Sequence, residues 1–361
     1  MQEMQRQAHL VLEDGTAYAG VAVGAAGIAA GEACFTTAMA GYEQAVSDPS
    51  YARQVLAFTY PLVGNYGPGA AALESARVWT NGIVMRRGRP EWSAWLAAQG
   101  VVALEEVDTR ALVRRLRDEG AMRCALGEAP VEELHARALA EPHLDWERAL
   151  VEPALASTAP ALEACVSEPV SVGSGPRVAV LDLGCKRSIV RRLAESGVEA
   201  HVVPGWWDAD AILELEPAAV LVGNGPGDPA QLTEQVETVR ALLGRVPLFG
   251  ICLGHQLVGL ALGLRTYKLP FGHRGANHPV RVCGSSRVLV TAQNHGYAVE
   301  AGGDVAVTHV SLNDETVEGL AGDGFETLQF HPEAAPGPHD AVPFFDRIAA
   351  ACRREPTFAA S

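Results

Sequence analysis

Residues 246–264 read VPLFGICLGHQLVGLALGL, and this stretch decides the fold class. A short apolar run leads into the stretch, and a helix-like pattern of apolar residues leaves it. Gly250 and Gly254 lie two places on either side of Cys252. In the nucleophile elbow G-x-S-x-G, glycines at these positions permit a tight turn from strand to helix that presents the nucleophile above a sheet. The stretch therefore predicts an α/β domain with Cys252 at the turn.

A cysteine at such a turn is chemically favoured. The N-terminal end of the following helix favours a thiolate, and the backbone N–H of Leu253 points to where an oxyanion would form. The alternative is a small buried cysteine in a glycine-rich packing contact. The stretch is also almost long enough to span a bilayer, but Pro247, the central His255-Gln256 and four glycines favour a strand, a turn and a buried helix. We therefore expect no membrane span.

The pattern around this stretch extends the α/β prediction. Continuous apolar runs predict strands at 177–184, 200–204 and 218–223, and a helix is expected at 186–196. Strands that are apolar throughout are typical of a parallel sheet covered by helices on both faces. From Asn277 onward the strands alternate more and helices are few, which predicts an antiparallel extension.

The first half of the chain is richer in strands. Two apolar runs flank Asp14-Gly15, which is a strong hairpin signal, and helices are expected at 91–99, 109–119 and 131–140. Residues 168–176 concentrate Pro, Gly and Ser, as linkers do. We predict a smaller β-rich α/β domain, a linker and a larger domain with a mainly parallel sheet, at residues 1–152, 153–176 and 177–355.

The composition excludes several classes of function. The 361 residues carry 28 Lys and Arg against 43 Asp and Glu, a formal net charge of −15. A balance this negative repels nucleic acid and anionic lipid, so we expect neither as a partner. Seven scattered cysteines without a C-x-x-C pair predict reduced thiols in a cytoplasmic protein. The N-terminal MQEMQRQ lacks the apolar segment of a signal peptide.

Two further motifs complete a predicted catalytic site. In His331-Pro332-Glu333, proline favours extended backbone, so His331 and Glu333 share a face and can form a triad with Cys252. On its own this triplet is more often a surface turn. The rigid loop N-G-P-G-D-P at 224–229 follows a parallel strand, where open sheets bind ligands, and its N–H groups offer a second oxyanion donor.

Nucleotide and metal sites are not indicated. The chain contains no G-x-x-x-x-G-K-[ST] motif, so an ATP-binding P-loop is not expected. His273, His278 and His295 lie in polar, glycine-rich stretches without a carboxylate at ligand spacing, so we expect structural or substrate-loop roles and no metal.

Together, GICLGHQ, NGPGDP and HPE resemble the class I, triad-type glutamine amidotransferases. Longer strings narrow the resemblance to the carbamoyl-phosphate synthase small-chain family. These strings, which lie between about His9 and Ile348, are LVLEDGTAYAG, AGYEQAVSDPSYARQ, TYPLVGNYG, VDTRAL, FGHRGANHPV, AQNHGYAV and HPEAAPGPHDA. Other amidotransferases share only the second domain, so the strings of the first half decide between families.

The resemblance implies site residues and partners. It implies a triad of Cys252, His331 and Glu333 and backbone oxyanion donors at Gly225 and Leu253. The glutamine-binding positions that it implies are Ser50, Gly225, Gly227, Leu253, Gln256, Asn294, Gly296 and Tyr297. Tyr297 stands where phenylalanine is common, and Ser50 implies that the first domain reaches the site.

By the same resemblance, this chain hydrolyses L-glutamine and needs no cofactor of its own. The ammonia goes to a large subunit that uses ATP and magnesium to make carbamoyl phosphate for arginine and pyrimidine synthesis. The alternatives are a stand-alone cysteine hydrolase, an amidotransferase subunit of another synthase, and a catalytically inactive interaction module.

Overall fold

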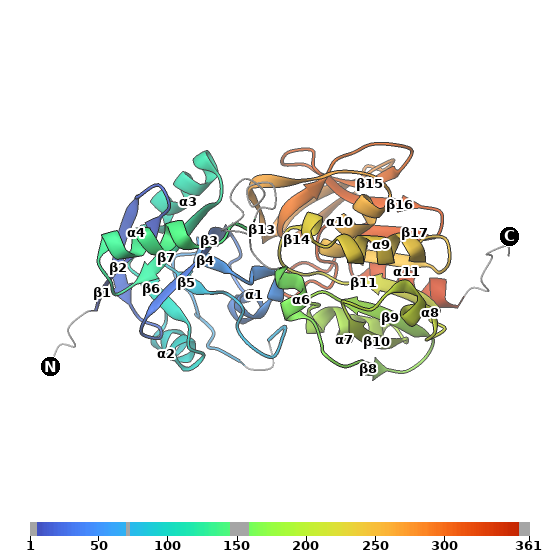
Figure 1. Ribbon diagram of the computed structural model, residues 1–361, viewed down its shortest axis with the longest axis horizontal. Coiled ribbons are helices and arrows are strands. Elements are labelled where there is room, and N and C mark those ends of the chain that lie inside the picture. Colours follow the sequence, from blue (N-terminus) through green and yellow to red (C-terminus); the bar gives the residue numbers. More distant parts are fainter. Residues whose placement is uncertain (1–5, 70–72, 145–158, 354–361) are drawn as a thin grey trace. The chain divides into compact units, whose positions relative to one another are not determined.

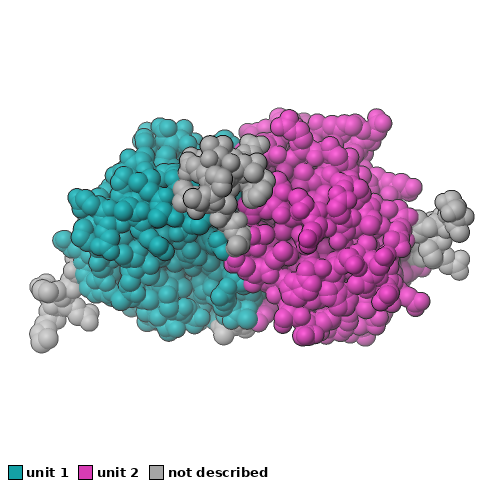
Figure 2. All heavy atoms as spheres, viewed as in Figure 1, with its two compact units in different colours: residues 1–158, 270–274 teal, residues 159–269, 275–361 magenta. Residues whose placement is uncertain are grey.

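The computed structural model describes residues 6–69, 73–144 and 159–353. Its contacts separate into two compact units, coloured in Figure 2. Unit 1 comprises residues 1–158 and 270–274, and unit 2 comprises 159–269 and 275–361. The predicted boundary at residue 152 lies outside the described residues. Among the helices that the structure describes, none has the length and apolar character needed to cross a membrane.

Unit 1 is built on a closed β barrel. Its strands follow the order β1-β2-β6-β5-β4-β3-β7, with β7 pairing back to β1 (Figure 1). The strands are β1 (Gln7–Leu12), β2 (Ala17–Ala22), β3 (Ile28–Thr36), β4 (Gln54–Phe58), β5 (Gly82–Val84), β6 (Val102–Glu105) and β7 (Met122–Gly127). The β1–β2 pair confirms the hairpin predicted around Asp14-Gly15.

The described helices of unit 1 include the three that were predicted, at close to their predicted positions, and two short ones that were not predicted. They are α1 (Tyr42–Ser47), η1 (Pro49–Tyr51), α2 (Pro90–Ala98), α3 (Thr109–Glu119) and α4 (Val131–Ala140). In α3, the buried Leu112 and Leu116 lie one turn apart while the arginines face outward, as the amphipathic pattern predicts. The side chain of Asp108 caps this helix by accepting a hydrogen bond from the Ala111 N–H.

The segment predicted as a linker contains regular structure where it is described. Residues Pro160–Ala164 form α6, and Val170–Gly173 form β8, which pairs antiparallel with β10 (Glu199–Pro204). All four residues of β8 are exposed. Its sequence V-S-V-G does alternate, but the pattern covers only four residues within a stretch rich in Pro, Gly and Ser, so it was predicted as part of a linker.

Unit 2 contains a sheet of ten described strands in the order β14-β13-β15-β16-β17-β12-β11-β9-β10-β8. Strands β10, β9, β11, β12 and β17 run parallel, and antiparallel strands flank them. The remaining bounds are β9 (Arg177–Asp182), β11 (Ala219–Val222), β12 (Leu248–Ile251), β13 (Thr266–Val282), β14 (Val288–Val299), β15 (Ala306–Ser311), β16 (Val317–Gly322) and β17 (Phe325–Leu328). The predicted α/β class and antiparallel extension are confirmed.

Helices cover both faces of the parallel strands. Alternate residues of each strand point to opposite faces, so Val180 packs in one core and Leu181 in the other. Helices α7 (Arg187–Glu195) and α11 (Pro343–Cys352) contribute to the first core. The second core holds residues of α8 (Ala209–Leu213), α9 (Thr233–Leu242) and α10 (Leu253–Ala261).

This topology places four loops at one edge of the sheet. Strands β9, β11, β12 and β17 are consecutive neighbours and parallel, so their carboxyl ends lie together. Open α/β sheets bind ligands at this edge. The loops that follow these four strands contain Lys186, the 224–229 loop, Cys252 and His331.

Candidate functional site

Cys252 lies between β12 and α10 in a strained conformation. Its φ of 55° and ψ of −103° fall outside the regions that side-chain-bearing residues normally adopt. Gly250 and Gly254 make this turn possible. A Cβ on Gly250 would lie 2.7 Å from the backbone carbon of Gly254, and one on Gly254 would lie 2.1 Å from the Val222 carbonyl oxygen. The local geometry is therefore that of a nucleophile elbow.

The cysteine is buried but lies among polar groups. Its residue is 2% exposed, and Sγ lies 3.7 Å from the carbonyl oxygen of Asn294 on β14. Leu253 is the first residue of α10, so its N–H has no acceptor within the helix.

His331 and Glu333 are held together after β17. The N–H of His331 donates to the Ala292 carbonyl at 2.9 Å, which pairs His331 with β14, and Pro332 and Glu333 form a turn instead of the predicted extended backbone. Nδ1 of His331 lies 2.8 Å from Oε1 of Glu333, and both side chains are almost completely buried. Nε2 makes no hydrogen bond of standard geometry among the described residues, which leaves it available to a nearby reactant.

The charges of this pair perturb each other's pKa. Burial alone lowers the pKa of His331, but Glu333 and the sulfur of Cys252 outweigh burial and raise it to about 10. Burial alone raises the pKa of Glu333, but Lys186 and His331 lower it well below its usual value. At neutral pH the imidazole is therefore protonated and the carboxylate ionised.

A lysine that the sequence analysis did not single out joins this pair. Nζ of Lys186 donates to Oε1 of Glu333 at 2.8 Å and to the carbonyl oxygen of Ala335 at 2.6 Å. The side chain is 5% exposed. The sequence places Lys186 directly after a predicted parallel strand, at the same sheet edge as Cys252, and this position could have marked it as a candidate site residue. Nothing in the sequence indicated that Glu333 would be its partner.

The 224–229 loop packs tightly against its neighbours. Oδ1 of Asn224 accepts a hydrogen bond from the backbone N–H of Lys186 at 3.0 Å. A Cβ on Gly225 would lie 2.0 Å from the carbonyl oxygen of Leu183. Gly227 has φ of +92°, and a Cβ there would meet Pro160 at 2.8 Å. Both glycines are therefore needed for this loop to approach the segment after β9 and the start of α6.

Gln256 and β14 form another wall near the cysteine. Gln256 lies on α10, and its Nε2 donates to the Tyr297 carbonyl at 3.0 Å and to Oε1 of Gln329 at 3.1 Å. Any ligand contact by its side chain would therefore go through Oε1. Asn294, Gly296 and Tyr297 are all residues of β14.

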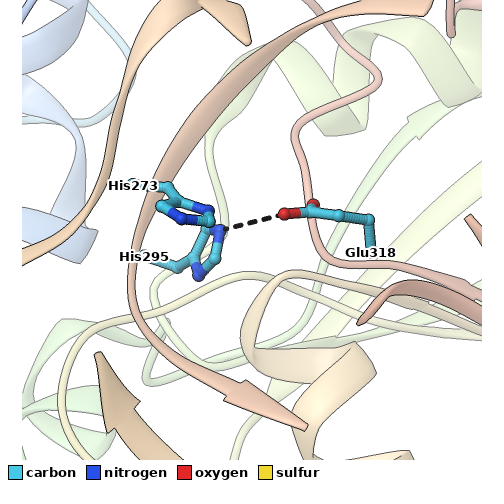
Figure 3. Close-up of side chains that lie close together, drawn as sticks. All are labelled: His273, His295 and Glu318. Carbon is cyan, nitrogen blue, oxygen red and sulfur yellow. Dashed lines mark ion pairs between the residues drawn. The ribbon is translucent and has the colours of Figure 1, made fainter. Parts of the chain in front are cut away.

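Other histidines of unit 2 have structural partners. Burial lowers the pKa of His255 to about 3, and its Nδ1 lies 2.9 Å from Oγ1 of Thr327, so this neutral ring packs inside the unit. His295 does have a carboxylate neighbour, contrary to what the sequence spacing indicated. Its Nε2 lies 3.9 Å from Oε1 of Glu318, and a dashed line marks this contact in Figure 3. Glu318 follows His295 by 23 residues and comes from β16, so only strand pairing brings them together.

Ser50, the remaining predicted glutamine contact, belongs to unit 1. It lies in η1, where its N–H donates to Oδ1 of Asp48 at 2.9 Å. The other predicted positions all belong to unit 2.

Comparison with known proteins decides the family. Residues 179–351 match the model of the family described as glutamine amidotransferase class-I, and residues 10–126 match carbamoyl-phosphate synthase small chain, CPSase domain. The chain is 46% identical over 356 residues to the carbamoyl phosphate synthase small chain of Symbiobacterium thermophilum, covering 94% of this chain and 97% of the relative. The chain belongs to the carbamoyl-phosphate synthase small-chain family.

Further members of the carbamoyl-phosphate synthase small-chain family match this chain over nearly its whole length. The small chain of Thermus thermophilus is 42% identical, with 96% of this chain and 94% of the relative covered, and that of Listeria innocua is 43% identical, with 94% and 95% covered. The chain is thus a glutamine amidotransferase subunit of carbamoyl-phosphate synthase. The match to both halves disfavours an amidotransferase of another synthase, because the first half matches a model specific to this family.

Proposed function

We propose that this small chain hydrolyses L-glutamine to glutamate and ammonia through Cys252, His331 and Glu333. The observation that carries the proposal is the strained turn of Cys252 at the start of α10, at the sheet edge where the His331–Glu333 pair follows the adjacent strand. A nucleophile, a base and a carboxylate that orients the base form a catalytic triad.

The proposed reaction has two halves. Sγ of Cys252 attacks the side-chain amide carbon of glutamine, and the N–H groups of Leu253 and Gly225 stabilise the oxyanion. His331 gives its proton to the amide nitrogen, so the C–N bond breaks and ammonia leaves a glutamyl thioester. Water, deprotonated by His331, then attacks the thioester carbon, and the C–S bond breaks to release glutamate and the thiolate.

The remaining predicted residues are assigned to binding. We assign glutamine recognition to Ser50, Gly225, Gly227, Leu253, Gln256, Asn294, Gly296 and Tyr297. The ammonia released goes to the large subunit, which makes carbamoyl phosphate from bicarbonate and two ATP for arginine and pyrimidine synthesis. Only un-ionised ammonia is a nucleophile, so direct transfer between subunits protects it from protonation in water. ATP and magnesium belong to the large subunit in this proposal.

The test compares two cysteine variants. Cys252→Ser is expected to abolish glutamine-dependent carbamoyl phosphate synthesis by the reconstituted pair while leaving ammonia-dependent synthesis intact. Cys283→Ser is the matched control, since Cys283 is half-buried beyond the end of β13 and free of disulfides. Adding the large subunit is expected to raise glutamine hydrolysis. Wild-type glutaminase activity in Cys252→Ser would refute the assignment.

A further inference from the structure

Gln329 is a completely buried glutamine that the proposed mechanism does not use. It directly follows β17, two positions before His331, and its backbone N–H donates to the carbonyl oxygen of Glu318 at 2.9 Å. Oε1 of its side chain lies 3.1 Å from Nε2 of Gln256 on α10. A buried amide is costly unless its polar atoms find partners, so this contact is the favourable interaction that offsets the burial of Gln329.

The orientation of the Gln256 amide is set by a backbone group. Its Nε2 lies 3.0 Å from the carbonyl oxygen of Tyr297, which can only accept a hydrogen bond. The amide nitrogen must therefore face Tyr297, and its second N–H points to Gln329. With both N–H groups engaged, Gln256 presents only Oε1 to a ligand, and this oxygen can accept hydrogen bonds but cannot donate them.

The orientation of the Gln329 amide follows from that of Gln256. Only the oxygen of Gln329 can accept from Nε2 of Gln256, so the nitrogen of Gln329 is turned away from it. That nitrogen is buried and has no hydrogen-bond partner among the described residues. A buried donor without an acceptor destabilises the fold, and violations of this kind are expected at functional sites. Gln329 is thus oriented toward Gln256, although its own N–H groups are left without acceptors.

This contact joins the two segments that carry the proposed nucleophile and base. Cys252 is the N-cap of α10, one turn before Gln256, and its N–H donates to the carbonyl oxygen of Leu328 at 2.8 Å. Leu328 and Gln329 are consecutive residues. The segment that leads to His331 therefore holds the elbow through its backbone and the Gln256 amide through its side chain.

We infer that Gln329 is a positioning residue for the substrate, which holds the Gln256 amide so that its Oε1 accepts a hydrogen bond from an N–H group of L-glutamine. L-Glutamine has such donors at its α-ammonium and at its side-chain amide. Without Gln329, the Gln256 amide is held by Tyr297 alone and gains rotational freedom, so part of the binding free energy is used to order it. This inference rests on the proposed function, in which Gln256 contacts glutamine.

The experiment measures the dissociation constant of L-glutamine by titration calorimetry in the full chain carrying Cys252→Ser. Calorimetry needs no turnover, so its result is separate from the test of the proposed function, for which ammonia release is measured with Cys252 intact. Adding Gln329→Met keeps the side-chain length but removes the acceptor, and it is expected to weaken binding by about 3- to 10-fold. With Cys252 intact, KM should rise by the same factor while kcat stays within about twofold, because the reacting groups are unchanged.

Two controls separate this role from simple support of the fold. Gln235 on α9 is 4% exposed and donates from Nε2 to the carbonyl oxygen of Gly205 at 3.1 Å, so Gln235→Met also removes a buried hydrogen bond of a glutamine. Its dissociation constant is expected to match that of the parent chain. In a Gln256→Met background, Gln329→Met is expected to add no further loss, because the side chain through which it acts is gone. Unchanged binding in Gln329→Met, or an equal loss in the Gln256→Met background, would overturn the inference.

If Gln329→Met does not fold, as judged by circular dichroism, the wild type supplies the test. The two side-chain amide protons of Gln256 are followed by nitrogen-15 NMR after transfer to deuterated water, and they are assigned by their absence from Gln256→Met. Slow exchange of both protons supports the inference, because both are then hydrogen-bonded. Fast exchange of either proton overturns it, because the amide is then not held at both acceptors.

Discussion

Replacing Gly254 with alanine tests whether the turn at Cys252 depends on close contact between α10 and β11. A Cβ at this position would lie 2.1 Å from the Val222 carbonyl oxygen, about 0.9 Å short of the 3.0 Å that real contacts respect. The obstacle is backbone in the middle of a sheet, so β11 cannot give way and α10 must move instead. The hydrogen bond from the Gly254 N–H to the Gly223 carbonyl, 3.1 Å, would be strained as well.

The magnitude follows from two opposing effects. Alanine is a better helix former than glycine by about 1 kcal/mol, whereas overpacking against a rigid neighbour costs about 1–3 kcal/mol or more. With a backbone clash this close, we expect a net loss of about 2 kcal/mol in the free energy of unfolding. Because Cys252 is the N-cap of α10, a helix displaced by about 1 Å carries the nucleophile with it, and a misplacement of that size costs about 100-fold in turnover.

The assay combines urea denaturation with ammonia release from glutamine at saturating substrate. Gly302→Ala is the matched control, since a Cβ there would only touch Leu264 at 3.6 Å, an ordinary contact. Gly302→Ala is expected to behave as wild type. Wild-type turnover and stability in Gly254→Ala would refute the reasoning that the glycine is needed for the turn.

Two further predictions concern how the buried pair changes stability with pH. The pKa of His331 in the folded state is raised to about 10. The stabilisation that His331 contributes is therefore complete below the pKa of about 6.5 that histidine has in the unfolded chain, and it is lost as the pH rises through 10. In urea titrations, the stability advantage of wild type over His331→Asn should shrink between these two pH values. The pKa of Glu333 is lowered, so its stabilisation is present above the unfolded value of about 4.3 and is lost on further acidification. The advantage over Glu333→Gln should be constant from pH 5 to 6.5 and fall below pH 4, and an advantage that grows on acidification would contradict the ion pair.

Local patterns in the sequence were enough to predict the α/β class, the hairpin at Asp14-Gly15 and the turn at Cys252. These features depend on residues close together in the chain, such as glycines two places from the cysteine. His331 and Glu333 do lie together, but Pro332 and Glu333 form a turn instead of the extended backbone from which their closeness was predicted. Strand β8 escaped prediction because its alternating V-S-V-G pattern is only four residues long and lies in a stretch rich in Pro, Gly and Ser.

Only the tertiary structure decided which distant side chains meet. Lys186 and Glu333 are separated by 147 positions, and they meet because β9, β11, β12 and β17 are parallel neighbours whose carboxyl ends share one edge. Glu318 comes beside His295 through the pairing of β14 with β16. Sequence periodicity describes which face of an element is buried, but it contains no information on the order of strands in a sheet. The partners of a buried charge are therefore set by topology, whereas the residue types that can react are set by the chain itself.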